Sequence, residues 1–486
     1  MSVFVRNIGA SFGSKILVRA LTFAVTICLA NHLGQERYGV FFFITQLAML
    51  LLAFIDLGWS MMVMRDAGRD PAGAGRALAN FLGFQIASSL LFCLGFVAFF
   101  YIMDYPAEWR ALAIAATLGL FAGGLNKAPY ATLVGVHRAD LASYTEVGAS
   151  ALSSMLYFLA IGFALPLWAF IAVFDIYFAL VLILALAFSR RAIGPLRLSV
   201  DKALWARMAR DGLPCSLIAA SYVLLSSMDW LMLSRMTGAN SRALGLYGAA
   251  FKLTAPFILI VEAAMLTVLP QLSSRYAAGP SGFRLLLDKS IKGLLAAGLP
   301  IAAGLALLAP EIIRTLLPEY GGAAGVLRLL AWRLPAIFGY AALNHALLAA
   351  NRTYTLAAIN VSGIALNFAL NWFWIPRWGP EGAAAATSCS HGAILVFYFA
   401  ARRWFFQFRV PAADAVRLAA ALGAMAGALV AWQMAFGETR HIPGLLVRVG
   451  LGAAVYGAAL AASGFIGPDE RPYLQREWDR LVRRRL

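Results

Sequence analysis

The chain has 486 residues, of which 62% are hydrophobic and 13% are charged, and its formal net charge is +17. Soluble domains carry about a quarter of their residues as Asp, Glu, Lys and Arg, so this composition excludes an ordinary soluble protein. A surplus of positive charge would indicate nucleic-acid binding in a soluble chain, but in a membrane protein it indicates orientation, and we expect no nucleic-acid partner.

Hydrophobic segments long enough to cross a bilayer follow one another along the chain, with short loops between them. About 20 apolar residues cross the hydrocarbon core, and in lipid such a segment must be helical because its backbone groups have no other hydrogen-bond partners. We therefore predict an all-α, multi-pass membrane protein with about 14 transmembrane helices. The predicted spans are residues 10–32, 40–64, 78–103, 110–135, 143–165, 167–189, 212–236, 246–270, 290–317, 324–350, 355–377, 381–402, 414–436 and 444–466.

Lysine and arginine are distributed unevenly between alternate loops. Of the 40 residues, about 25 fall in loops on one side, about 6 on the other and about 9 within the spans. Loops rich in Lys and Arg stay in the cytoplasm, so an even number of helices predicts that both termini are cytoplasmic. The alternation supports the helix count, because one missed span would invert every later loop.

Two stretches of the sequence resemble each other at a nearly constant offset. Tyr38-Gly39 begins the second span as Tyr247-Gly248 begins the eighth, and His137-Arg138 aligns with Asn351-Arg352. An even number of helices in each half predicts a parallel repeat, and transporters of this kind place the substrate site between the lobes. The predicted domains are an N-terminal six-helix lobe (1–205), a C-terminal six-helix lobe (206–410), an additional helix pair (411–466) and a basic cytoplasmic tail (467–486).

Charged side chains stand inside several spans, where they normally face protein or water rather than lipid. Lys15 and Arg19 lie on a polar stripe of the first span, within an arc of roughly 80°. The stripe allows two interpretations. The cations either line a water-filled cavity that attracts anions, or they pair with carboxylates such as Asp56.

Polar side chains in other spans would extend this candidate substrate site. The cations are Lys127 in the fourth span, Lys252 in the eighth and Arg333 in the tenth. One face of the eleventh span carries Asn360, Asn367 and Asn371. These amides are suited to sugar hydroxyls or, alternatively, to hydrogen bonds between helices.

Acidic residues within the spans are candidates for coupling transport to an ion gradient. A carboxylate in the membrane can exchange a proton or bind a cation, and its alternative role is counter-ion to a nearby Lys or Arg. The candidates are Asp56, Glu262 and Asp229. Asp56 and Glu262 occupy corresponding helices of the two halves. The sequence leaves open whether H+ or Na+ is the coupling ion.

Motifs of the common enzyme classes are missing from the sequence. There is no H-E-x-x-H, P-loop, G-x-S-x-G or dinucleotide-binding pattern, and no loop is long enough for an ATPase domain. We therefore expect a protein that is not an enzyme, with no catalytic residue, metal or cofactor. A membrane enzyme of polysaccharide assembly would need an acidic pair in an outer loop, for which only Asp104 and Glu108 are near.

Two segments carry a resemblance to a known family. The stretch from Arg6 to Gly68 contains Gly34, Tyr38-Gly39, Asp56-x-Gly58 and Arg65. A second stretch contains Ala350-x-Arg352, Asn360, Asn367, Asn371, Pro376, Gly379 and Gly382-Ala383-Ala384. Over roughly residues 1–405 the chain resembles polysaccharide flippases, the O-antigen and exopolysaccharide translocases of the multidrug/oligosaccharidyl-lipid/polysaccharide exporter superfamily.

This resemblance implies two six-helix lobes around a central cavity, in a flippase of the bacterial inner membrane that works by alternating access. Its substrate would be an undecaprenyl-pyrophosphate-linked oligosaccharide of lipopolysaccharide or exopolysaccharide biosynthesis. In such flippases a cationic cavity receives the pyrophosphate, and helices 1 and 8 flank a lateral portal, positions that Arg19 and Lys252 match. The partners implied are membrane lipids, a polysaccharide polymerase and other assembly proteins.

The last two spans resemble the arrangement in lipid II flippases, where added helices form a groove for the lipid tail. The alternative function is a cation-coupled drug or metabolite exporter of the same superfamily. Typical drug substrates are cations and would require a cavity dominated by acids, whereas the spans of this chain hold a surplus of Lys and Arg.

Overall fold

The computed structural model describes residues 2–56, 59–194, 201, 205, 221, 223–438 and 441–465, without the side chains of residues 2–17 and 19. Every regular element in these ranges is a helix, which confirms the predicted all-α fold. The chain forms two compact units, which are described separately. Unit 1 is Met1–Pro256 with Thr353–Ser390, and unit 2 is Phe257–Arg352 with His391–Leu486.

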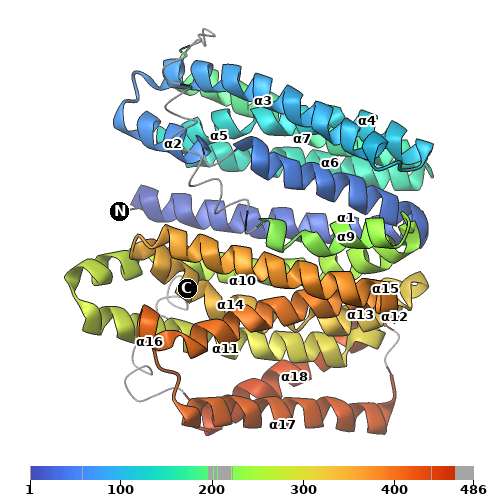
Figure 1. Ribbon diagram of the computed structural model, residues 1–486, viewed down its shortest axis with the longest axis vertical. Coiled ribbons are helices and arrows are strands. Elements are labelled where there is room, and N and C mark those ends of the chain that lie inside the picture. The colour runs from blue at the N-terminus through green and yellow to red at the C-terminus, as the bar shows by residue number, and fades with distance from the viewer. Residues whose placement is uncertain are drawn as a thin grey trace. The chain divides into compact units, whose positions relative to one another are not determined.

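Unit 1 is a helical bundle built mainly from the first six spans (Figure 1). In it α1 packs against α6 and α4, while α4 packs against both α3 and α7. Its elements are α1 (Ser2–Asp56), α2 (Trp59–Arg69), α3 (Ala74–Ile102), α4 (Ala107–Leu125), α5 (Lys127–Gly135), α6 (Ala139–Gly162), α7 (Leu167–Ile193), α9 (Met228–Met236), the first part of α10 (Ser241–Ala278) and most of α15 (Thr353–Ala400).

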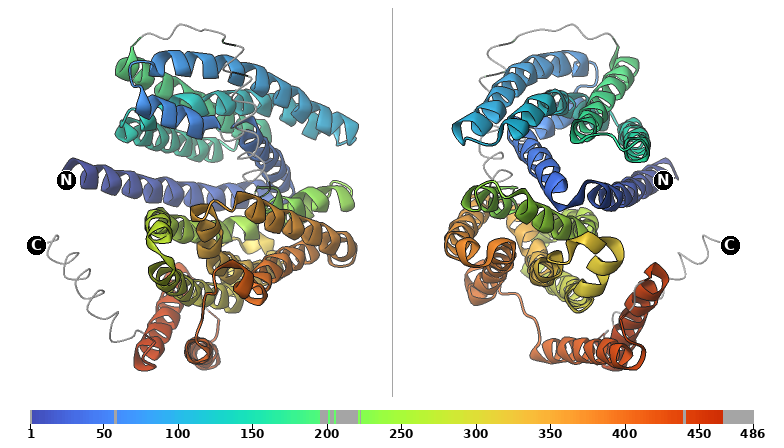
Figure 2. Two further views of the ribbon diagram at one scale, coloured as in Figure 1. Left: turned by 60° about the vertical axis from the view of Figure 1, so that its left-hand side comes forward. Right: turned by 90° about the vertical axis from the view of Figure 1, so that its right-hand side faces the viewer.

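Unit 2 contains the remaining helices, including the pair that follows the predicted repeat. There α11 packs against α14 and α17, and α17 packs against α18 (Figure 2). Its elements are the rest of α10 and of α15, α11 (Pro280–Leu307), α12 (Ala309–Leu316), the 3-10 helix η1 (Pro318–Tyr320), α13 (Ala323–Leu330), α14 (Arg333–Ala349), α16 (Arg402–Phe405), α17 (Ala412–Phe436) and α18 (Ile442–Ala462).

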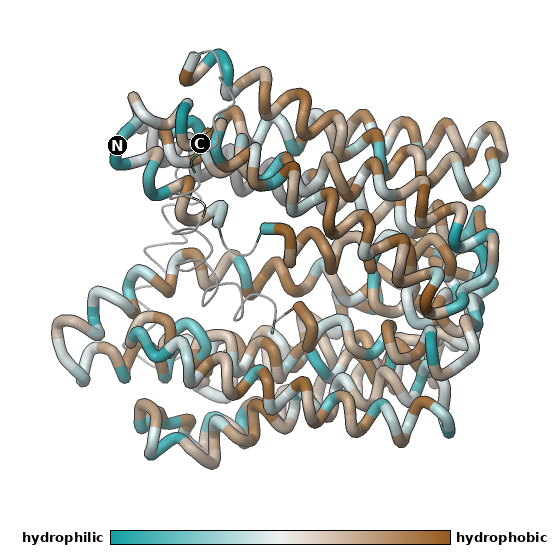
Figure 3. The backbone as a smooth tube through the Cα atoms, turned by 45° about the horizontal axis from the view of Figure 1, so that its top comes forward, coloured by the Kyte–Doolittle hydropathy of each residue, from teal (hydrophilic) through white to brown (hydrophobic). Residues whose placement is uncertain are grey.

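A helix lies in each of the predicted spans, although the seventh lies largely outside the described residues and is represented by α9 and by the helical residues 221 and 223–225. Two of the long helices each hold two spans and bend at a glycine with positive φ, Gly34 in α1 and Gly379 in α15. Within the described ranges, ten helices are long and apolar enough to cross a membrane. Hydrophobic residues dominate along the helices and hydrophilic ones gather mostly near their ends (Figure 3).

The ninth helix differs from its predicted bounds. This helix, α11, begins at Pro280 rather than near residue 290. Proline suits the first turn of a helix, and the polar residues that follow it are helical as well, so α11 starts before its apolar part. It ends at Leu307, and Pro310 stands at the start of the separate helix α12. Hydropathy therefore placed the apolar segment correctly but missed the break that proline introduces.

Two turns that are aligned by the predicted repeat have the same backbone conformation. His137 and Asn351 both adopt left-handed conformations, with φ of 62° and 56°. In each turn the next residue donates its backbone N–H to a carbonyl five residues back, Arg138 to Leu133 and Arg352 to Leu347, both at 2.8 Å. The division into lobes 1–205 and 206–410, a pair at 411–466 and a tail at 467–486 stays a prediction.

Candidate functional site

The second half of α1 and the first part of α10 cross in close contact within unit 1, and we call this crossing the α1–α10 seam. A Cβ atom on Gly39 would collide with the Ser241 carbonyl oxygen, and one on Gly245 would collide with the Gln35 carbonyl oxygen. A Cβ on Gly248 would meet the Phe42 ring. Glycine is therefore required for this approach, which explains the Tyr-Gly pair at the start of each helix.

Two polar pairs join the helices along the seam. Arg242 Nε donates to Gln35 Oε1 at 2.9 Å, and Lys252 Nζ donates to Gln46 Oε1 at 2.8 Å. A hollow of about 340 Å³ lies beside Gln35 and Arg242. Lys252 is half-buried, and its bond to Gln46 connects α10 with α1.

The other predicted cations are placed as follows. Lys127 stands at the break between α4 and α5, half-buried, and within the described ranges it makes no hydrogen bond or ion pair. Arg333 is 4% exposed at the start of α14, in unit 2, where it interacts electrostatically with His391. Lys15 and Arg19 belong to the helical backbone of α1, but their side chains lie outside the described residues. Unit 1 thus contains Lys127 and Lys252, while Arg333 belongs to unit 2.

The three asparagines of the eleventh span are all buried in unit 1. Asn360 donates to Ser221 Oγ at 3.2 Å, which is a bond between helices. Asn371 Nδ2 donates to Asn367 Oδ1 at 2.8 Å, within one helix. In the part of the chain that the structure describes, Asn367 Nδ2 and Asn371 Oδ1 have no hydrogen-bond partner. Each such buried group costs about 1–3 kcal/mol, so this amide pair is suited to receive another polar group.

Asp229 is the most enclosed of the coupling candidates, with no exposed surface. Its carboxylate accepts hydrogen bonds from the Tyr247 hydroxyl and, at 2.9 Å, from Thr387 Oγ1. The carboxylate thereby connects α9, α10 and α15 within unit 1. These hydroxyl partners were not expected from the sequence, which suggested lysine or arginine counter-ions.

The other two coupling candidates are in different surroundings. Asp56 accepts the backbone N–H of Ser60 at 3.1 Å and its hydroxyl at 2.8 Å, and so caps the beginning of α2. Glu262 lies on α10 in unit 2, where it is exposed and makes no hydrogen bond or ion pair among the described residues. The sequence contained a signal for this capping role, because Asp56 and Ser60 flank Gly58 just before a helical segment.

Sequence reasoning missed a buried ion pair in unit 2. Arg448 on α18 pairs with Glu311 on α12 and also donates to the Leu429 carbonyl oxygen at 3.1 Å. Beside the pair lies an apolar groove of about 260 Å³ between α11, α17 and α18, lined by residues such as Pro300 and Met425. Glu311 and Arg448 both lie within predicted spans, and two opposite charges within spans could have indicated a buried ion pair.

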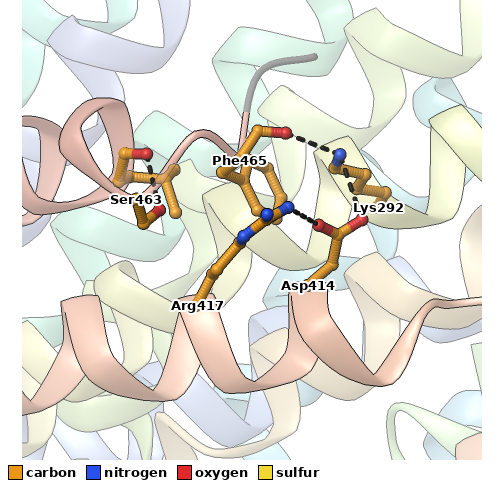
Figure 4. Close-up of polar contacts among 6 residues, drawn as sticks. Lys292, Asp414, Arg417, Ser463 and Phe465 are labelled. Atoms are coloured by element: carbon orange, nitrogen blue, oxygen red, sulfur yellow. Dashed lines mark hydrogen bonds and ion pairs between the residues drawn. The ribbon is translucent and has the colours of Figure 1, made fainter.

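A second ionic cluster ties α11 to α17 (Figure 4). Lys292 Nζ lies 3.1 Å from the Asp414 carboxylate and donates to the Phe465 carbonyl oxygen at 2.7 Å. Arg417 reaches the same carboxylate at 3.0 Å. Because every charge in this cluster faces an opposite one, we regard it as a structural anchor of the last helix pair.

Comparisons with known families agree with this architecture. Residues 4–275 match the model of a family described as polysaccharide biosynthesis proteins, and residues 155–452 match that of the lipid II flippase MurJ. Each match covers more than half of the chain, and both lie in the group that the sequence resemblance predicted. No curated protein sequence matches the chain.

Solved structures show the same fold. A lipid II flippase MurJ in an inward closed conformation is 15% identical, with a TM-score of 0.77 over 93% of this chain and 98% of that one. An inward-facing MATE family multidrug resistance transporter of the MOP superfamily is 15% identical, with a TM-score of 0.66 over 80% and 94%. A MOP superfamily transporter from Pyrococcus furiosus is 16% identical, with a TM-score of 0.54 over 82% and 94%. At these identities the likeness shows the fold alone.

Proposed function

Because the chain belongs to the family of polysaccharide biosynthesis proteins and to that of the lipid II flippase MurJ, we propose that it flips an undecaprenyl-pyrophosphate-linked oligosaccharide across the bacterial inner membrane. Its family is one of multi-pass membrane flippases for lipid-linked saccharides. Beyond the family, we propose four features: a polyprenyl carrier, a glycan such as O-antigen or exopolysaccharide, a place in the inner membrane, and transport by alternating access.

The observation that carries this proposal is the state of Lys127, a cation within the spans of unit 1. Its side chain is half-buried at a helix break and makes no hydrogen bond or ion pair in the described ranges. Lys252, half-buried in the same unit, contacts Gln46 on α1. A cation inside a membrane protein costs a few kcal/mol unless water or an anion compensates it. A diphosphate with roughly two negative charges would supply that compensation. Lys15 and Arg19 on α1 extend the proposed set in unit 1, and Arg333 in unit 2 is a separate candidate.

The amide pair of the eleventh span supports a role in binding the saccharide. Asn367 Nδ2 and Asn371 Oδ1 offer one donor and one acceptor that are buried and unbonded in the described structure. A sugar hydroxyl can both donate and accept, so a single hydroxyl could satisfy both atoms. Asn360, which already bonds to Ser221, would contribute less.

The apolar groove of unit 2 supports a place for the lipid tail. It lies between α11 and the added helices α17 and α18, and its lining includes Pro300, Met425 and Gly452. Because an isoprenoid chain is already surrounded by lipid, its binding there would be stabilised by packing against these side chains rather than by removal from water. The charges at its edge, Arg448 and Glu311, are paired with each other.

Asp229 is the coupling residue that we propose first, with H+ or Na+ as the ion. Protonation would make its carboxyl a donor and change its bonds to Tyr247 and Thr387, which lie on two other helices. A bound cation would draw on the same oxygen atoms. Asp56 and Glu262 remain candidates, although the bond from Ser60 gives Asp56 a structural role of its own.

The proposal is tested by glycan export from cells that carry Lys127→Ala or Lys252→Ala. We expect export to fall at least tenfold while the protein remains in the membrane, because each lost contact between a cation and a phosphate is worth about 1.5–3 kcal/mol. Arg190→Ala is the matched control, an exposed cation at the end of α7 in the same unit. Wild-type export from both lysine variants would contradict the assignment, and altered drug sensitivity instead would favour the exporter.

A further inference from the structure

A second cationic hollow lies in unit 2, where the turn between α10 and α11, the turn before α15 and helix α16 meet. Its volume is about 330 Å³, and its lining includes the side chains of Arg284, Arg352 and Arg403. Phe283 and Phe406 also line it and are buried, and the Arg352 guanidinium lies 5.9 Å from the Phe406 ring centre. We call this the triple-arginine pocket.

The frame of the pocket is held by specific hydrogen bonds. Arg275 Nη1 donates to the Gly282 carbonyl oxygen at 3.3 Å and fixes the turn between α10 and α11. The Asp288 carboxylate accepts the backbone N–H of Arg409 at 2.8 Å and fixes the chain after α16. Asp288 lies one helical turn beyond Arg284 and interacts electrostatically with both Arg284 and Arg409, but it is not among the residues that line the pocket. Three cations therefore share one hollow.

The turn that the predicted repeat aligns with this one provides a comparison for Arg352. At the aligned position in the other half, Arg138 follows a left-handed residue in the same kind of turn. There the guanidinium is paired with its own neighbour, because Arg138 Nε lies 3.2 Å from Asp140 Oδ1. The residue aligned with Asp140 is Tyr354, which is 81% exposed and cannot pair with Arg352. Asp140 therefore neutralises Arg138 in the first turn, and the second turn has no acid at the corresponding position to neutralise Arg352.

The surroundings of the pocket indicate which molecules reach it. All three arginines are exposed, so they do not carry the full cost of burial and are available to a ligand. The neighbouring Trp404 is 80% exposed, and exposed tryptophan is enriched at the boundary between lipid and water. The loops concerned are those predicted to be cytoplasmic, where anionic lipids and soluble phosphates both occur.

We propose that the triple-arginine pocket binds a phosphate-bearing anion, with Arg284, Arg352 and Arg403 as the donors. Guanidinium groups form paired hydrogen bonds with phosphate oxygens, and three of them around one hollow match a phosphate better than a carboxylate. The phosphate belongs either to the headgroup of an anionic phospholipid or to a soluble phosphorylated molecule. Binding at this pocket requires no transport, so the inference is independent of the proposed function.

The test measures binding to the full-length purified protein by two probes. Native mass spectrometry counts phosphatidylglycerol and, for comparison, zwitterionic phosphatidylethanolamine retained by the protein. A thermal-shift titration with inorganic pyrophosphate measures the soluble arm. The variants are Arg352→Gln combined with Arg403→Gln, and Tyr354→Asp, which restores the acid found in the other half. Arg402→Gln is the control, an exposed neighbour that does not line the pocket.

We expect the double variant to weaken binding of one or both probes at least tenfold and Tyr354→Asp to weaken it several-fold, with Arg402→Gln unchanged. Loss confined to phosphatidylglycerol assigns a lipid headgroup, and loss confined to pyrophosphate assigns a soluble ligand. Tyr354→Asp removes no arginine, so it remains informative if the double variant misfolds. Equal binding by the wild type, the double variant and Tyr354→Asp in both arms would overturn the proposal.

Discussion

The buried pair of Arg448 and Glu311 gives the sharpest prediction about stability. The side chains are 1% and 4% exposed, so almost no solvent screens them. Removing one member of such a pair typically costs about 3–5 kcal/mol, because the other charge stays buried. Arg448→Met keeps most of the volume beside the groove but leaves the Glu311 carboxylate without the guanidinium, and we expect a loss in that range.

The double variant Glu311→Leu with Arg448→Met should behave differently. It removes both charges together with the Arg448 Nε group, which has no hydrogen-bond partner in the described structure. Replacement of a buried pair by apolar residues is often neutral or stabilising by about 1–4 kcal/mol. The assay is a double-mutant cycle of unfolding in mixed micelles. A coupling energy below about 1 kcal/mol would refute the reasoning that the two charges depend on each other.

Three further predictions concern unit 1. Gly39→Leu should abolish export and destabilise the purified protein, because any side chain there collides with the backbone of Ser241. Gly95→Ala is the control: its added methyl group meets no neighbouring atom, so the free energy of unfolding should fall by no more than about 0.5 kcal/mol and can rise. Asp229→Asn should retain the fold but remove the dependence of transport on an ion gradient in proteoliposomes, and an unchanged dependence would exclude Asp229 as the coupling residue. Asn371→Leu should change unfolding stability by about 1 kcal/mol or less, because it removes the unsatisfied Asn371 Oδ1 but leaves Asn367 Oδ1 without its bond, and these two effects oppose each other. Export should fall markedly, and full export would remove Asn371 from the substrate site.

The helical fold was predictable because hydropathy reports directly on the cost of placing polar groups in lipid. Hydropathy did not predict where helices break within the spans. The helix that ends at Leu307 and the interruption between α4 and α5 at Lys127 depend on local backbone preferences that an apolar average conceals. The two family matches confirm the flippase resemblance that the Tyr-Gly and asparagine patterns indicated.

The candidate site was predictable in its residue types and less so in its partners. Lys252 and Asp229 were recognised as unusual because they are charged within spans, but their partners Gln46 and Thr387 lie far away in the sequence. Neither partner is charged, so no rule of charge pairing would have found it. For Asp56 the partner lies close in the sequence, because Ser60 is only four residues away. Asp56 was nevertheless interpreted as a coupling candidate, and its capping role was not predicted.

Direct binding of undecaprenyl pyrophosphate to the purified protein tests the central claim, that half-buried cations within the spans receive a pyrophosphate headgroup. The comparison is between the wild type and the double variant Lys127→Ala with Lys252→Ala, with undecaprenol as the ligand that lacks phosphate. The account predicts that the variant binds the pyrophosphate at least about tenfold more weakly and undecaprenol equally well. Equal affinity of both proteins for the pyrophosphate would contradict it.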